Sequence, residues 1–284
     1  MTTVETFQPY PDELKHGLII ESVSFGYDGT PVLENINLSV REAEFLILLG
    51  PSGSGKTTML RLLAGLETPA SGRVICKGKT VECPSTERGM VFQDYTLFPW
   101  MNLMDNVILA ISKAHPDLDK SSRRHLAEEY LIMVDLYDAR QKHPYELSGG
   151  MRQRGVLART LAMGPQFMLM DEPFGALDPI NRTRLQDLVL KIWSDASPPK
   201  TIVFVTHDTD EALYLGDRVV MLGSNPGRII AEVSVESPRP RSRHKFFQSR
   251  MFQELSDQVL DHFRRDVIDR LESVDTAKGY GEGI

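Results

Sequence analysis

Gly-Pro-Ser-Gly-Ser-Gly-Lys-Thr, residues 50–57, is the stretch that decides the fold, because it matches the phosphate-binding pattern G-x-x-x-x-G-K-[ST]. The apolar run at residues 45–49 comes directly before it and predicts a buried strand. Residues 58–64 predict a helix that stops at Gly65. A glycine-rich surface turn would not need strand, loop and helix in this order. We therefore predict an α/β fold with a phosphate-binding loop.

The loop supplies what a nucleoside triphosphate requires. Backbone N–H groups converge on the phosphate oxygens, and the N-terminus of the following helix adds positive potential. Lys56 is expected to reach the β- and γ-phosphates, and the Thr57 hydroxyl to bind Mg²⁺. The loop residues that we predict to bind the nucleotide are Gly50, Pro51, Ser52, Gly53, Ser54, Gly55, Lys56, Thr57 and Thr58.

Two carboxylates follow the apolar run at residues 167–170. A buried parallel strand would deliver Asp171 and Glu172 to its carboxyl end, where open α/β sheets bind ligands. Asp171 suits the shell of Mg²⁺, with a water molecule between them, and Glu172 is free to polarise a water that attacks the γ-phosphate. An isolated Asp-Glu pair at a strand end is common, so the assignment depends on the loop upstream.

The run Leu147-Ser148-Gly149-Gly150-Met-Arg-Gln153 comes before the two carboxylates, and a helix is predicted after it up to Gly164. The run resembles the signature of the ATP-binding cassette (ABC) family. That resemblance implies ATP and Mg²⁺ as cofactors and a homodimer of ATPase subunits, in which Ser148 and its glycines grip the γ-phosphate of the partner. A plain serine N-cap with a glycine turn is the structural alternative. Gly155 costs the helix about 1 kcal/mol relative to Ala and predicts close packing.

The resemblance assigns roles to four further residues. Gln93 and His207 each end a β-branched apolar run; Gln93 would contact Mg²⁺ or the attacking water, and His207 the γ-phosphate. Tyr27 would stack on adenine, a contact worth about 1 kcal/mol, and Asp178 would reach across the dimer interface. The expected catalytic residues are then Lys56, Gln93, Glu172 and His207, and the expected Mg²⁺ ligands are Thr57, Gln93 and Asp171.

The resemblance covers about residues 17–235 and implies a P-loop NTPase (RecA-like) core with an antiparallel β subdomain and an inserted α-helical subdomain. Strands predicted over 18–25, 32–40 and 45–49 form an antiparallel start, and strands over 167–170, 201–205 and 218–222 form the parallel core. Residues 94–165 are expected to form the helical subdomain, with one amphipathic helix after a serine cap at Ser122. Residues 1–16 are an N-terminal extension.

Residues 236–284 are predicted to form a basic linker and a C-terminal helix. The linker at 237–245 carries two prolines and five basic side chains, so a helix cannot run through it. Apolar residues then recur every four positions from Phe247 to Leu271. We expect this helix to dock on the chain's own core, with a dimer or regulatory contact as the alternative. The linker either is solvated, which we favour, or approaches anionic lipid.

Composition excludes several classes of protein. A net charge of −7 and a pI near 5.6 argue against a partner that is nucleic acid. The apolar runs fall far short of the roughly 20 residues that cross a bilayer, and no secretion signal opens the chain. Cys76 and Cys83 lack metal-binding spacing, which indicates reduced thiols in the cytosol.

A single cassette without membrane helices is typical of the energy-coupling subunit of an importer, peripheral on the cytoplasmic face of the cell membrane. Residues 97–100 follow Gln93, and the resemblance to the family implies that they present an apolar groove to a helix of transmembrane permease subunits, with a solute-binding protein as an indirect partner. Residues 97–103, 222–229 and 238–241 resemble the nitrate, sulfonate, taurine and bicarbonate importer branch.

Two other classes remain to be weighed. A soluble ABC ATPase of DNA repair or translation is the main alternative, but repair proteins carry long coiled coils between these motifs and translation proteins carry two cassettes. A kinase would need no signature run.

Overall fold

A six-stranded sheet forms the centre of the protein. The computed structural model describes residues 16–94, 97–175, 177–197 and 199–279, with side chains up to residue 268. In sheet order the strands are β10 (Arg228–Ser234), β9 (Arg218–Gly223), β3 (Phe45–Leu49), β8 (Thr201–Thr206), β7 (Phe167–Asp171) and β6 (Arg88–Val91). All neighbouring pairs are parallel except β10 with β9. Strands β3, β7, β8 and β9 are buried throughout, as parallel strands between two layers are.

The second sheet is antiparallel. Its order is β2 (Thr30–Arg41), β1 (His16–Tyr27), β4 (Ser71–Cys76) and β5 (Lys79–Thr80). The prediction that residues 45–49 belong to an antiparallel start is wrong, because β3 lies between β8 and β9 in the parallel sheet. Its uninterrupted apolar sequence explains the difference, since such a run suits a strand that is covered on both faces.

Alternate residues of the central strands face two different layers. Leu46 and Leu48 of β3 pack with helix α1 (Lys56–Ala64) and the antiparallel sheet in one apolar cluster. Phe45 and Ile47 face the other cluster, which includes α5 (Pro179–Asp195) and α6 (Thr209–Leu215). The period of two along a strand produces this division. The carboxyl ends of the strands between these layers are therefore held rigidly.

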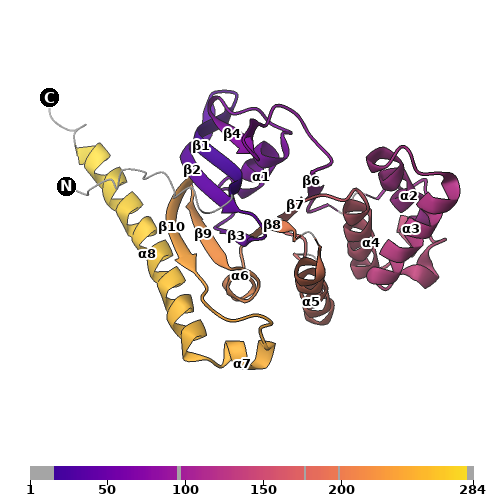
Figure 1. Ribbon diagram of the computed structural model, residues 1–284. Helices are drawn as coiled ribbons and strands as arrows, with labels where there is room; N and C mark the ends of the chain where they lie inside the picture. The colour runs from indigo at the N-terminus through magenta and orange to yellow at the C-terminus, as the bar shows by residue number, and fades with distance from the viewer. Residues whose placement is uncertain (1–15, 95–96, 176, 198, 280–284) are drawn as a thin grey trace.

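Three helices form a group beside the core, at the right of Figure 1. They are α2 (Leu103–Ala114), α3 (Lys120–Met133) and α4 (Gly149–Ala162), with 3₁₀ turns at Tyr137–Ala139 and Pro144–Glu146. The cap of α3 is Asp119 and not Ser122 as predicted, because the Asp119 carboxylate accepts the hydrogen bond of the Ser122 N–H at 2.7 Å. Gly155 confirms the expected close packing, since a Cβ there would lie 2.7 Å from Leu103 Cδ1.

The chain closes with α7 (Arg243–Phe247) and α8 (Arg250–Gly279). Helix α8 lies along β10 and contacts α6 (Figure 1). Val259 is fully buried, and Phe252, Leu255 and Phe263 pack on the core, so docking on the chain's own core is confirmed. Among the described helices none combines the length and the apolarity needed to cross a bilayer.

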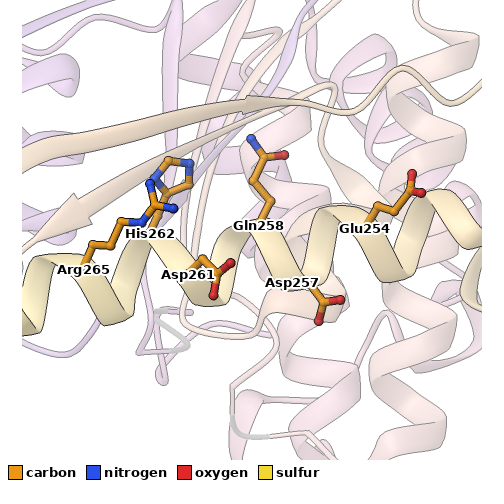
Figure 2. Close-up of a pocket in the computed structure, with 6 residues that line it drawn as sticks. All are labelled: Glu254, Asp257, Gln258, Asp261, His262 and Arg265. Atoms are coloured by element: carbon orange, nitrogen blue, oxygen red, sulfur yellow. The ribbon is translucent and has the colours of Figure 1, made fainter.

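Two details of this C-terminal region differ from the sequence-based expectation. Helix α7 begins at Arg243, inside the basic stretch, because both prolines lie before it. Met251, Leu260, Val267 and Ile268 remain exposed. The face of α8 shown in Figure 2 is polar, with a shallow hollow that is lined only by side chains of this helix: Glu254, Asp257, Gln258, Asp261, His262 and Arg265.

Candidate functional site

The glycine-rich loop runs from the end of β3 to the start of α1. Gly53 and Gly55 adopt the left-handed region with φ of +79° and +84°, and Gly55 is the N-cap of α1. A Cβ at Gly50 would lie 2.6 Å from the Leu222 carbonyl oxygen, so only glycine fits there. No side chain of the described residues caps α1. Its first N–H groups are therefore available to an anion at the helix N-terminus.

Lys56 curls back over this loop. Its Nζ donates hydrogen bonds to the carbonyl oxygens of Gly50 and Pro51, both at 2.8 Å. Burial lowers the pKa of Lys56, and the charges of Glu172 and Asp171 partly offset that effect. The ammonium group thus lies over the curl of the loop, where a phosphate oxygen can replace a carbonyl oxygen as its acceptor.

Thr57 and Asp171 meet at the end of β7. The Thr57 hydroxyl donates to Asp171 Oδ1 at 3.0 Å. Burial raises the pKa of Asp171; the Thr57 hydrogen bond lowers it and the nearby charge of Glu172 raises it further. A cation beside these two oxygen ligands would stabilise the carboxylate, and Mg²⁺ prefers such ligands. The two residues therefore fit the group that the sequence predicts here.

Glu172 and His207 also lie together. Glu172 has a φ of +41°, and its N–H donates to the Val205 carbonyl oxygen of β8 at 3.1 Å. Its Oε2 is 3.2 Å from Nδ1 of His207, which follows β8. The Glu172 side chain is mostly buried, whereas 60% of the His207 side chain is exposed. Two neighbouring strand ends thus place a carboxylate and an imidazole beside the phosphate-binding loop.

Gln93 and Tyr27 are exposed residues that lie at or just after the ends of two other strands. Gln93 follows the edge strand β6, whose last residue pairs with Met170 of β7. Tyr27 ends β1; its hydroxyl donates to Glu67 Oε1 at 3.2 Å and its ring packs edge-on against Phe25. Both side chains are therefore accessible to solvent, and their contact with a bound nucleotide stays a prediction.

The signature run and Asp178 form a second group of site residues. Ser148 caps α4, and its Oγ accepts a hydrogen bond from the Met151 N–H at 3.3 Å. A Cβ at Gly149 would meet nothing within 4 Å, whereas Leu147 and Gln153 are buried. The structure describes no hydrogen bond from these residues to the phosphate-binding loop. The N-terminus of α4 at Gly149 therefore has open space beside it, where an anion could bind.

Asp178 stands beside this group as the N-cap of α5. Its Oδ1 accepts hydrogen bonds from the N–H groups of Ile180 and Asn181, both at 3.1 Å. These bonds lower the pKa of Asp178. A Cβ at Gly150 would lie 3.5 Å from Asn181 Cγ, so the N-terminal ends of α4 and α5 are adjacent.

Residues 33–175 match the ABC transporter family. The chain belongs to the ABC transporter family. It is 40% identical to the bicarbonate transport ATP-binding protein CmpD of Synechococcus elongatus, covering 92% of this chain and 96% of the relative. It is 42% identical to the nitrate import ATP-binding protein NrtD of the same organism (82% and 85%) and 44% identical to the taurine import ATP-binding protein TauB of Pseudomonas syringae (78% and 84%).

The fold of this ABC protein also matches solved structures. One is the dimeric post-hydrolysis state of the ATP-binding cassette MJ0796 bound to ADP and Pi, with 31% identity and a TM-score of 0.69 over 78% of this chain and all of that chain. The expected P-loop NTPase fold is confirmed. The chain is therefore an ATPase of the ABC type, as the motifs predict.

Residues of α8 adjoin the site, which the sequence did not indicate. A cavity of about 430 Å³ is lined by the phosphate-binding loop, by helix α8 and by the turns that follow β8 and β9. Its lining residues are Leu49, Gly50, Pro51, His207, Thr209, Ser224, Phe263, Asp266 and Val267. The apolar repeat predicted that α8 packs on the core. The repeat did not predict which part of the core α8 contacts, because an apolar stripe defines the buried face of a helix and not the surface against which that face packs.

Proposed function

We propose that this chain is the ATP-binding and ATP-hydrolysing subunit of an importer and that it energises the uptake of a small anion or organosulfonate through separate membrane subunits. Nitrate, sulfonate, taurine and bicarbonate are the solutes in question. The observation that carries the proposal is the grouping of Lys56, Asp171, Glu172 and His207 around one phosphate-binding loop, in a chain whose relatives have import and transport names.

The site residues divide the work of hydrolysis. Glu172 accepts a proton from the attacking water, whose oxygen bonds to the γ-phosphorus as the bond to the bridging oxygen of ADP breaks. Lys56 and His207 stabilise the charge that develops on the γ-phosphoryl oxygens. Thr57, Gln93 and, through water, Asp171 would hold Mg²⁺, which would neutralise phosphate charge. Residues 50–58 hold the phosphates, and Tyr27 stacks on the adenine.

The second group of residues acts in a dimer. A head-to-tail pair would place the N-terminus of α4 from one chain against the γ-phosphate bound by the other. Ser148, Gly149 and Gly150 would bind that phosphate, Leu147 and Gln153 would hold the signature run in place, and Asp178 would cross the interface. The dimeric cassettes to which this chain is similar support the arrangement. Hydrolysis then removes the contacts that held the dimer closed.

An exposed aromatic surface is where we place the permease. Trp100 is 69% exposed, and its ring centroid is 5.4 Å from that of Phe98. Such rings suit an apolar face of a partner helix. The chain would then sit at the cytoplasmic face of the cell membrane as a peripheral subunit, and a solute-binding protein would act through the permease.

Co-purification of the tagged chain from its native membranes tests the proposal. A multi-span partner that stimulates ATP hydrolysis is the expected result. Trp100→Ser should lose that partner and keep basal hydrolysis, whereas Tyr145→Ser, which removes an equally exposed ring, should retain it. Recovery only as a soluble dimer, or with ribosomes or DNA, would overturn the transport role and leave the ATPase assignment standing.

A further inference from the structure

Helix α6 begins directly after His207 and is short. It has seven residues, from Thr209 to Leu215, and its N-cap Asp208 accepts a hydrogen bond from the Glu211 N–H at 3.0 Å. A helix of this length is not stable through its own hydrogen bonds, because nucleation is costly and few bonds follow it. Its geometry, and with it the position of His207, therefore depends on contacts from other elements.

The basic linker supplies such contacts at the C-terminal end of α6. Arg241 donates hydrogen bonds to the carbonyl oxygens of Leu213, Tyr214 and Gly216, at 3.2, 2.8 and 2.7 Å. Arg241 is buried, which lowers its pKa to about 10, yet it remains a cation at neutral pH. Carbonyl groups at a helix C-terminus are left without partners inside the helix and carry partial negative charge, so a guanidinium group suits them.

Arg239 extends the same contact. It donates to the Leu215 carbonyl oxygen and, at 2.9 Å, to Oδ1 of Asp217. These contacts contradict the expectation of a solvated linker, since Arg239 and Arg241 are used within the protein.

A second set of contacts reaches the N-terminal half of α6. Arg243 Nη2 donates to Gln186 Oε1 at 2.8 Å, and Gln186 Nε2 donates to Glu211 Oε1 at 2.7 Å. Gln186 and Glu211 are buried. Because Glu211 also donates its N–H to Asp208, the next residue after His207, the series runs from the linker to the turn that carries His207.

We propose that the C-terminal segment, residues 236–268, is a positioning device for ATP hydrolysis, in which the linker arginines hold α6 at both ends and so fix His207 for the γ-phosphate. The proposal rests on the role of His207 proposed above. Arg239, Arg241 and Arg243 are positioning residues, because they act through α6 and not on the substrate. Packing of α8 against α6 and β10 keeps the linker in place.

The arrangement predicts an effect on turnover and not on nucleotide binding. Preorganised donors accelerate a reaction only while they stay aligned with the charge that develops. The linker contacts none of the residues of the phosphate-binding loop among the bonds described, so ground-state binding of ATP does not depend on it. A looser α6 should lower kcat and leave KM for ATP unchanged.

Arg243 is the residue to test, because its side chain is 31% exposed and it reaches α6 in two ways, through Gln186 and by lying over the Tyr214 ring, 4.1 Å from the ring centroid. Arg243→Gln removes its bonds to Gln186 and Asp187 and its contact with the Tyr214 ring. Arg250→Gln is the matched control: it makes the same change of charge in the same segment, at an 89% exposed side chain that pairs with Glu254 on α8. Each variant of the full chain is assayed alone and in a His207→Ala background, with kcat, KM and Tm as readouts.

Arg243→Gln should lower kcat roughly three- to tenfold, the factor that the net contribution of one ordinary hydrogen bond, about 0.5–1.5 kcal/mol, supplies. KM should not change, and Tm should fall by no more than a few degrees, because buried Gln186 loses one partner. Arg243→Lys should recover part of the loss of kcat, and Arg250→Gln should match the wild type. In the His207→Ala background Arg243→Gln should cause no further loss, because contacts that act through one group are not additive. Hydrogen exchange of the amides in residues 208–216 should become faster in Arg243→Gln.

Four outcomes would overturn the inference. An equal loss of kcat with and without His207 would mean that Arg243 does not act through His207. An unchanged kcat, or a loss of kcat seen only at temperatures close to the Tm of the variant, would assign the segment a purely structural role. Normal turnover in His207→Ala itself would refute the role proposed for His207 and this inference with it, while the assignment as an ATPase would stand.

Discussion

Glu172 occupies a backbone conformation that few residues other than glycine adopt, with a φ of +41° at the end of β7. The bond from its N–H to Val205 holds that conformation and turns the carboxylate toward His207. Residues held in such regions occur often at active sites. The two neighbouring carboxylates thus have different proposed roles. Glu172 has to face the γ-phosphate as the general base, whereas Asp171, one position before it, is the proposed Mg²⁺ ligand.

Glu172→Gln should therefore abolish turnover and leave nucleotide binding intact. The amide is nearly the same shape but cannot accept the proton of the attacking water. ATP-dependent dimers should accumulate, as measured by size-exclusion chromatography beside a phosphate-release assay. Glu254→Gln, an exposed change on α8, serves as the control. A Glu172→Gln protein that hydrolyses ATP normally would remove Glu172 from the role of base.

Single residues of the site were predictable from the sequence to different degrees. Thr57 with Asp171 and Glu172 with His207 were expected at one place, because the carboxyl ends of parallel strands meet at one edge. The hydrogen bonds of Lys56 to the carbonyl oxygens of its own loop were not predictable, because the sequence motif describes the contacts of the lysine when a phosphate is bound. The cap at Asp119 was missed because Ser and Asp are both good N-caps and sequence alone does not rank two candidates three residues apart.

Among the elements, α4 shows most directly why a glycine is used inside a helix. A Cβ at Gly155 would lie 2.7 Å from Leu103 Cδ1 and 3.2 Å from Leu97 Cδ1, and both leucines are buried. Helix α4 thereby approaches the start of α2 more closely than any larger residue would permit.

Gly155→Ala should leave the protein about 1–3 kcal/mol less stable than Gly149→Ala, although Ala is the better helix former inside α4. The reason is that a Cβ at Gly149 meets nothing within 4 Å, whereas at Gly155 it overpacks the interior. Chemical denaturation of the two variants measures the difference. Equal stabilities would mean that the leucines move aside without cost.

The sequence predicts individual helices and strands better than it predicts which of them pack against one another. The strands near the site and the helical character of residues 103–162 agree with their apolar periods, yet β3 was assigned to the wrong sheet. Strand order is decided by contacts between residues far apart in sequence, such as Leu46 with Val203, and a local pattern does not contain them. For the same reason the sequence predicts solvated linker arginines, because their partners lie on α5, on α6 and in the turn after α6.

At the scale of the whole molecule, one buried arginine ties both sheets together. Arg218 of β9 donates to Glu44 Oε1 at 2.8 Å, to Glu232 of β10 at 2.6 Å and to the Ser39 carbonyl oxygen of β2. Burial raises the pKa of Glu44, but the hydrogen bonds and charge of Arg218 outweigh it, so the pKa lies below its ordinary value of 4.5.

The wild-type protein should lose stability in acid through this pair. A carboxyl whose pKa is lowered by folding contributes stability above its unfolded pKa, and the contribution is lost as the pH falls below 4.5 through the folded pKa. Glu44→Gln should cost about 3–5 kcal/mol at pH 7, because it breaks a buried pair, and should flatten the acid limb of the stability curve. Glu21→Gln, at an exposed pair with Arg73, should do neither. Denaturation midpoints between pH 3 and 7 measure both effects.

The dimer gives the remaining prediction at this scale. Ser148→Arg should block the ATP-dependent association of two chains, because a large cation at the N-terminus of α4 opposes the helix dipole and fills the place of the phosphate. Monomer binding of nucleotide should be unaffected. Ser122→Arg, at the exposed start of α3, is the control. Sedimentation with ATP measures association, and unchanged dimerisation of Ser148→Arg would contradict the head-to-tail arrangement.

The contact of Arg241 with the carbonyl groups of α6 also bears on how the protein is made. A ribosome synthesises α6 before the linker and before α8, so His207 and its helix leave the exit tunnel ahead of the arginines that hold them. The phosphate-binding loop is synthesised earlier still. In a growing polypeptide the phosphate-binding loop would thus be complete before the contacts that position His207, and full turnover would be reached only after the linker is made.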